Sequence, residues 1–139
     1  HTHPFVSVYE AYKKSGPNVL GVEALQGDDG CTGVKVNTAD GYADYLFSAT
    51  DMQAHHPSKR VSFCGRLGLI REKEGQIQLM YLGCGRSLKK GNFVLESDHD
   101  VYAAIYMQHG VWYYSATGPV RVKIGKETKK LNEGYNQKL

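Results

Sequence analysis

Apolar and polar side chains alternate with a period of two residues along most of this chain. In one clear stretch, Val120, Val122 and Ile124 point to one side, and the two basic residues between them point to the other. This period is typical of a β-strand with one buried face. Glycine-containing breaks interrupt the pattern roughly every eight to twelve residues, which is the turn spacing of all-β domains. The alternation therefore predicts an all-β domain.

Two of the breaks predict tight hairpins. Asp40-Gly41 supplies residues that tolerate a positive φ, and His109-Gly110 alone separates two apolar stretches. Strands joined by such short turns favour an antiparallel two-sheet β-sandwich of about ten strands, with a closed barrel as the second choice. The expected strands are Pro4–Tyr12, Val19–Leu25, Thr32–Asn37, Tyr42–Ala49, Arg60–Glu72, Gln76–Leu82, Asn92–Ser97, Val101–Gln108, Val111–Ala116 and Val120–Ile124.

The length of 139 residues fits one domain with a core of its own. We expect the β-sandwich to span residues 1–127 and residues 128–139 to form a polar C-terminal tail. The first residues already follow the strand pattern, and no initiator methionine precedes them. We therefore expect the chain to be a piece of a longer protein, with a partner domain upstream.

The charge of the chain is mildly basic, with a formal net charge of +3. Its lysines and arginines are scattered along the chain, with short clusters at Arg86–Lys90 and Lys123–Lys130 that are most simply solvated surface. The sharper alternative is weak attraction to a polyanion such as an acidic polysaccharide. No nucleic acid is expected as a partner, because no DNA- or RNA-binding motif is present. No membrane is expected either, because no run of about 20 apolar residues occurs.

Metal and cofactor chemistry is not expected. Cys31, Cys64 and Cys84 lack the CxxC spacing of a zinc site, and they leave at least one thiol outside any disulfide. Their disulfide state is open on the sequence alone. His1 and His3 share one face of a strand and could hold a metal with a third ligand from elsewhere. The favoured alternative is that they are ordinary residues at a domain boundary.

Two further histidine motifs carry no catalytic assignment. Adjacent side chains diverge at His55-His56, which makes a shared metal still less expected. In Asp98-His99-Asp100, an imidazole between carboxylates would gain basicity if they were close. Ordinary turn chemistry explains the same two aspartates. No nucleophile and base with a family spacing accompany either motif.

Aromatic side chains form the most suggestive constellation. Trp112 and Tyr114 share one strand face, and Tyr106 lies across the tight turn. Such rings can stack on sugars, with Arg86 nearby to bond hydroxyls or carboxylates. The weak candidates for carbohydrate binding are therefore Trp112, Tyr114, Tyr106 and Arg86. The alternative, which is favoured, is that these aromatics fill the core.

Five strand-like segments follow one another in a characteristic order: Pro4-Phe-Val-Ser-Val-Tyr-Glu10, Gly41-Tyr-Ala-Asp-Tyr-Leu-Phe-Ser48, Gly65-Arg-Leu-Gly-Leu-Ile-Arg71, Leu79-Met-Tyr-Leu-Gly-Cys-Gly85 and Gly91-Asn-Phe-Val-Leu-Glu96. Together they resemble the C-terminal β-sandwich region of heparinase II/III-like polysaccharide lyases. The resemblance extends to about Gly125. It implies a parent enzyme with an N-terminal α/α-toroid that cleaves uronate-containing polysaccharide by β-elimination. It also implies a periplasmic or secreted location. No position here matches the family's catalytic motifs, so no catalytic residue is transferred.

Three functional hypotheses follow. The first is a non-catalytic C-terminal domain that supports the toroid of a polysaccharide lyase. The second is a carbohydrate-binding module whose platform includes Trp112 and Tyr114. The third is a domain that completes a catalytic site of the intact enzyme through His1, His3 or His99.

Overall fold

A computed structural model describes residues 7–12, 14–25 and 30–139 of the chain. These residues form ten strands, and every pairing between named strands is antiparallel. The strands are β1 (Val19–Leu25), β2 (Cys31–Thr38), β3 (Tyr42–Ala49), β4 (Val61–Lys73), β5 (Gln76–Lys90), β6 (Phe93–Gln108), β7 (Val111–Ala116), β8 (Val120–Ile124), β9 (Glu127–Leu131) and β10 (Gly134–Lys138). The expected all-β, antiparallel class is therefore confirmed. The described residues form no helix with the length and apolar character needed to cross a bilayer.

The ten strands belong to one continuous sheet, so the expected pair of separate sheets is not what the structure shows. The order is β1-β2-β3-β4-β5-β6-β7-β10, with β8 paired to β6 and β9 paired to β8. The reason is the length of β5 and β6, which have 15 and 16 residues. Strand β5 continues past the expected end at Leu82, and β6 joins the expected strands Asn92–Ser97 and Val101–Gln108. Of the expected first strand, the described residues 7–12 carry no strand.

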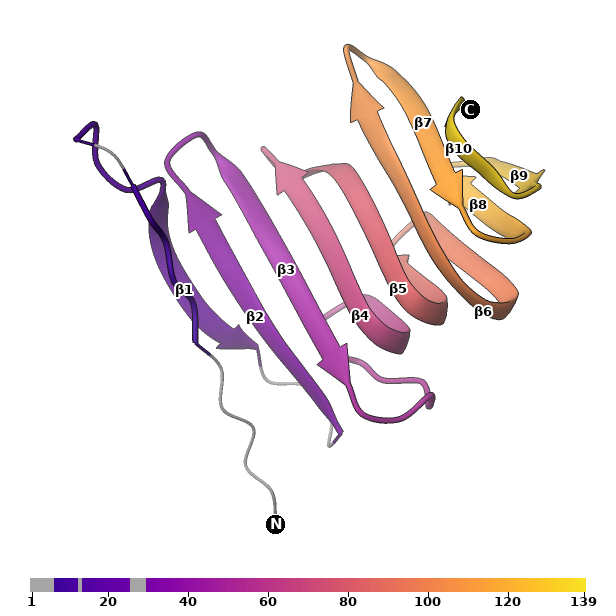
Figure 1. Cartoon of the computed structure of the whole chain (residues 1–139), viewed down its shortest axis with the longest axis horizontal. Coiled ribbons are helices and arrows are strands. Elements are labelled where there is room, and N and C mark those ends of the chain that lie inside the picture. Colours follow the sequence, from indigo (N-terminus) through magenta and orange to yellow (C-terminus); the bar gives the residue numbers. More distant parts are fainter. Residues whose placement is uncertain (1–6, 13, 26–29) are drawn as a thin grey trace.

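Long strands let the sheet fold back on itself, and β4, β5 and β6 curl behind the front layer in Figure 1. The register of β4 and β5 shifts at Gly65 and Gly85, which lie opposite each other. A Cβ at Gly85 would lie 2.7 Å from the Cys64 carbonyl oxygen and 2.8 Å from the Gly65 Cα. Only glycine fits here, and the left-handed φ of 49° at Cys84 completes the bulge. Bulges of this kind bend a strand and sharpen its twist.

The bend brings apolar side chains from both halves of the sheet into one core. Ile70, Met80 and Ile105 stand opposite one another in adjacent strands, on one side of the bend. Phe63 and Leu88 pair on the other side of it and belong to the same buried cluster. We call the side of the front layer that carries Ile70, Met80 and Ile105 the inward face, and the opposite side the outward face.

The residues expected to form a polar tail contribute to two strands. Strand β9 pairs with β8 and β10 with β7, and the Leu139 backbone N–H donates to the Trp112 carbonyl oxygen at 3.0 Å. Their side chains are mostly exposed, in agreement with their polarity. A domain boundary at residue 127 stays a prediction.

Two leucines in adjacent strands test this description of the core. We expect Leu82→Ala to lower the free energy of unfolding by about 2–5 kcal/mol, because Leu82 is fully buried beside the bend. Leu67→Ala, on the outward face, is the control and should change it by about 0.5 kcal/mol or less. Urea denaturation measures both values, and equal effects would contradict the assignment of the two faces.

Candidate functional site

A groove of about 440 Å³ lies in the outward face, across strands β5, β6, β7 and β10. Three of its lining residues are tyrosines, of which Tyr102 is 54% and Tyr135 77% exposed. The residues that line it are Tyr81, Tyr102, Ala103, Ala104, Ser115, Ala116, Thr117, Glu133, Gly134 and Tyr135. The groove thus combines aromatic rings with hydroxyl and carboxylate groups.

The strand register explains why the sheet is hollow at this point. Tyr81, Ala104 and Ser115 stand opposite one another on β5, β6 and β7, so they form one row of the outward face. The row on one side contains the paired residues Tyr106 and Tyr113. On the other side, the Tyr102 backbone N–H donates to the Thr117 hydroxyl at 3.0 Å. The small side chains of the middle row therefore lie between taller aromatic ones.

The ring of Tyr81 occupies the space that a side chain at Gly83 would fill. A Cβ at Gly83 would lie 3.0 Å from Tyr81 Cε1 and 3.2 Å from the Tyr81 hydroxyl oxygen. Residues two apart on a strand share a face, so the ring lies along its own strand above Gly83. An aromatic ring that covers a strand glycine is a recognised packing device. It fixes this ring at the wall of the groove.

A stacked tyrosine pair borders the groove. The rings of Tyr106 and Tyr113 have centroids 5.9 Å apart and an interplanar angle of 17°. The Tyr106 hydroxyl donates to the Asn136 side-chain oxygen. The Ser115 hydroxyl accepts the Asn136 backbone N–H at 2.9 Å and donates to its side-chain oxygen at 3.3 Å. Asn136, at a left-handed φ of 50°, thereby ties β10 to this side of the sheet.

The sugar platform, the less favoured interpretation of these aromatics, does not come together, and Tyr114 and Trp112 join the core as the favoured one predicts. Tyr114 lies on the inward face, is 8% exposed and donates its hydroxyl to the Asn132 carbonyl oxygen at 3.2 Å. Trp112, two residues away, packs against Phe93 with ring centroids 6.0 Å apart. Tyr106 pairs with Tyr113, which lies between Trp112 and Tyr114 on β7, so Tyr106 lies on the outward face. The three aromatics are therefore divided between opposite sides of the sheet.

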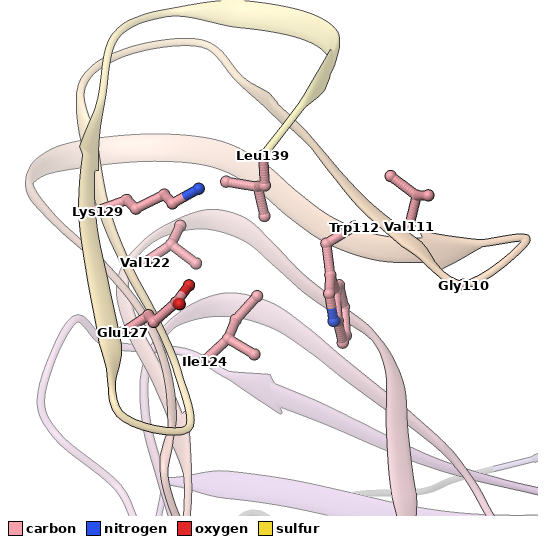
Figure 2. A pocket seen from close by; sticks show the side chains of 8 residues that line it. All are labelled: Gly110, Val111, Trp112, Val122, Ile124, Glu127, Lys129 and Leu139. Carbon is pink, nitrogen blue, oxygen red and sulfur yellow. The ribbon is translucent and has the colours of Figure 1, made fainter.

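Trp112 lines a cavity of its own, with a volume of about 250 Å³. In Figure 2 the indole ring faces the side chains of Ile124 and Val122, and Leu139 extends from the C-terminus into the same space. The other lining residues are Gly110, Val111, Glu127 and Lys129. The lining combines apolar side chains that pack at the edge of the core with one carboxylate and one ammonium group.

Arg86 is committed to an ion pair. Its Nε donates to Asp100 Oδ1 at 2.9 Å, and this bond raises the pKa of the guanidinium. Asp98, the other carboxylate beside His99, pairs with Arg121 at 3.5 Å. Both carboxylates of the Asp98-His99-Asp100 motif thus face arginines.

A polar hollow of about 450 Å³ adjoins this motif, and its lining includes Asp98, His99, Arg121 and Lys130. Arg121 Nε also donates to Glu96 at 3.2 Å, and Lys89 lies 3.3 Å from the same carboxylate. Burial alone would raise the pKa of Glu96. The Arg121 hydrogen bond and the Lys89 charge outweigh it, so the pKa is lowered. The charges around this hollow largely neutralise one another.

His55 is a structural anchor of the loop before β4. It is 4% exposed, and its Nε2 lies 2.7 Å from Asp51 Oδ1. Its backbone exchanges two hydrogen bonds with Phe63, of 2.7 and 2.9 Å. The Gln53 backbone N–H and then His55 lower the pKa of Asp51. These contacts hold the loop against the sheet.

Metal ligands were expected only as a remote possibility at His1 and His3, and both lie outside the described residues. Across the part of the chain that is described, no three His, Cys, Asp or Glu side chains gather closely enough to hold a metal ion. Cys64 donates its thiol to the Met52 carbonyl oxygen at 3.1 Å, and burial raises its pKa.

The fold and the groove define a class: a small antiparallel β domain with an aromatic outer face. Residues 19–107 match the family described as the endo-acting ulvan lyase C-terminal domain. The chain belongs to this family. It is also 34% identical over 101 residues to an endo-acting ulvan lyase of Formosa agariphila, covering 68% of this chain but 12% of that relative. No solved structure matches the chain.

The family match confirms part of the sequence-based interpretation, namely a C-terminal domain of a polysaccharide lyase. The matched region contains Tyr81, Tyr102 and Tyr106 and ends before Ser115 and Tyr135. None of Tyr81, Tyr102 and Tyr135 was assigned to a site from the sequence. Alternation on β6 places Tyr102 and Tyr106 on the face opposite Ile105, so the sequence does indicate that these two tyrosines share a face. The sequence does not indicate which of the two faces of β6 is buried.

The Asp51–His55 contact generates a pH prediction. Because folding lowers the pKa of Asp51, its ionised carboxylate stabilises the fold above the ordinary value of 3.8. That contribution is lost as the pH falls through the lower value of the folded state. We expect Asp51→Ala to lower the melting temperature at about pH 7 and to differ progressively less from wild type towards about pH 2.

The matched control is Glu23→Ala, which removes an exposed carboxylate on β1. Its melting temperature should follow that of wild type at every pH. A constant gap between Asp51→Ala and wild type across the series would show that the ionised carboxylate contributes nothing.

Proposed function

We propose that this chain is the non-catalytic C-terminal domain of a larger, heparinase II/III-like lyase that cleaves ulvan by β-elimination. Two observations support it: the match to the C-terminal domain family and the small share, 12%, of the relative that the chain spans. In this proposal an α/α-toroid upstream carries the catalytic residues. The parent enzyme acts in the periplasm or outside the cell, where it meets an acidic polysaccharide.

The observation that carries the supporting role is an apolar area on the outward face. Val22, Leu46 and Leu67 are between 40% and 53% exposed. The register places all three on the side opposite Phe47 and Ile70. Exposed apolar residues gathered on one face mark a contact surface, and interfaces between domains of one chain are of this kind. We propose that the upstream domain covers these three side chains.

A second function, carbohydrate binding, is favoured by a different observation, the tyrosine groove further along the same face. The groove lies at β5, β6, β7 and β10, whereas Val22, Leu46 and Leu67 lie on β1, β3 and β4. The two surfaces are adjacent and distinct. One domain can therefore support the enzyme and bind its substrate.

The proposal predicts that the isolated chain produces no unsaturated uronate from ulvan, while the full-length parent does. Ultraviolet absorbance of the product measures this. Activity of the isolated chain, abolished in a boiled sample, would contradict the non-catalytic role.

The contact surface has a separate test in the full-length parent. We expect Leu46→Asp with Leu67→Asp to lower its melting temperature but to leave that of the isolated chain nearly unchanged, because both side chains are exposed there. Lys126→Asp, in an exposed turn, is the control. Identical melting of the double variant and wild-type parent would rule out this surface as the contact.

A further inference from the structure

We propose that the tyrosine groove binds a polysaccharide chain by stacking sugar rings on Tyr81, Tyr102 and Tyr135. The identity of the polysaccharide as ulvan rests on the proposed function, whereas the binding mode rests on the groove itself. The site differs from the Trp112 and Tyr114 platform expected from sequence. It goes beyond a supporting role, since it assigns the domain a ligand.

The shape of the groove suits an extended chain. It crosses four neighbouring strands, and strands lie about 4.8 Å apart, so it spans roughly 14 Å. This is long enough for more than one sugar ring. The floor of small side chains, Ala104 and Ser115, lets a flat ligand approach the sheet between the tyrosines.

The walls of the groove present aromatic surface that is already in place. The ring of Tyr81 lies over Gly83, and the stacked pair Tyr106 and Tyr113 stands beside it. Tyr102 and Tyr135 remain exposed. Aromatic side chains combine a large apolar surface with a polar tip, which fits the apolar C–H face and the hydroxyls of a sugar. Rings that are already oriented lose little freedom on binding.

The polar groups of the groove are hydrogen-bonding rather than cationic. Ser115 and Thr117 carry hydroxyls that already bond Asn136 and the Tyr102 backbone N–H, respectively. Glu133 is the charged residue among those that line the groove. A carboxylate in the groove disfavours a uronate carboxylate at the same point. We infer that the bound ring is held by its C–H face and hydroxyls and that acidic groups of the polymer point away. Affinity should then depend weakly on salt.

Weak salt dependence separates this groove from the alternative that the basic clusters attract a polyanion. Contacts between lysine or arginine and a polyanion weaken steeply as salt rises, because exposed charges are screened. The cluster Lys123–Lys130 includes Lys130, which lines the hollow beside His99 rather than the groove. The two binding modes thus use different residues and respond differently to salt.

The test measures ulvan binding to the isolated chain by isothermal titration, without turnover. We expect Tyr102→Ala with Tyr135→Ala to weaken binding by about tenfold or more, since each lost aromatic contact costs a several-fold change. Tyr12→Ala, which removes another exposed tyrosine away from the groove, is the matched control and should bind as wild type. Circular dichroism checks that all variants keep the β fold.

Two further measurements locate the ligand. Raising the salt concentration should change the affinity of wild type by less than about threefold, well below the loss expected of a polyanion contact. The fluorescence of Trp112, the single tryptophan, should not shift on saturation. A shift of that emission, or a steep salt dependence, would place the polymer elsewhere and overturn the proposal.

The remaining outcomes also decide the question. Ulvan binding that survives the double variant, or absence of any polysaccharide binding to wild type, would overturn the groove as a site. If the upstream domain covers the groove instead, the double variant would destabilise the full-length parent and leave the isolated chain without a ligand. Binding of alginate but not ulvan, lost in the double variant, would support the groove and contradict the assignment to an ulvan lyase.

Discussion

The fold depends on the close approach of two backbones at Gly65 and Gly85. Without side chains at these positions, β4 and β5 can shift register and bend while they stay paired. The bend allows one sheet to supply both layers around the core, with Phe63 and Leu88 from one half and Ile70 and Met80 from the other. A domain of this size needs such layering, because a single flat sheet would leave one apolar face uncovered. The bend at the glycine pair thus lets a single sheet form the two layers that a sandwich builds from two sheets.

Folding the sheet on itself also divides the chemistry of the chain between its two faces. The inward face carries aliphatic residues and Tyr114, whose hydroxyl is satisfied by the Asn132 carbonyl. On the outward face of the front layer, Leu67 and Tyr102 are exposed among the described residues. Because the inward residues are buried in the core, the two proposed contact surfaces consist of outward residues. The same alternation that stabilises the fold therefore places the candidate surfaces.

Period-two alternation predicted the strands between Val19 and Ile124, but it missed β9 and β10 and placed strand boundaries wrongly where a strand passes through unusual residues. The expected strand ends at Leu82, but β5 continues through Gly83-Cys84-Gly85 as a bulge because its partner strand carries Gly65 opposite Gly85. At Asp98-His99-Asp100 the acidic residues resemble a turn, yet each aspartate pairs with an arginine on β5 or β8, so β6 runs on. For the site, alternation placed Trp112 and Tyr114 on one strand face, whereas the separation of Tyr106 from them came from the register of β6 and β7. Alternation could not say which side was buried, since that depends on the bend.

Gly83 connects the two outward surfaces that the proposed roles require. A Cβ at this position would lie 3.0 Å from the ring of Tyr81 and 3.1 Å from the Cβ of Leu67. The groove wall and the apolar contact area therefore meet at a single glycine. If the upstream domain packs on Leu67, it ends directly beside the ring of Tyr81. In the proposed arrangement, a polysaccharide chain held in the groove then leads to the edge of that domain, so the proposed supporting domain also presents substrate to the proposed catalytic one.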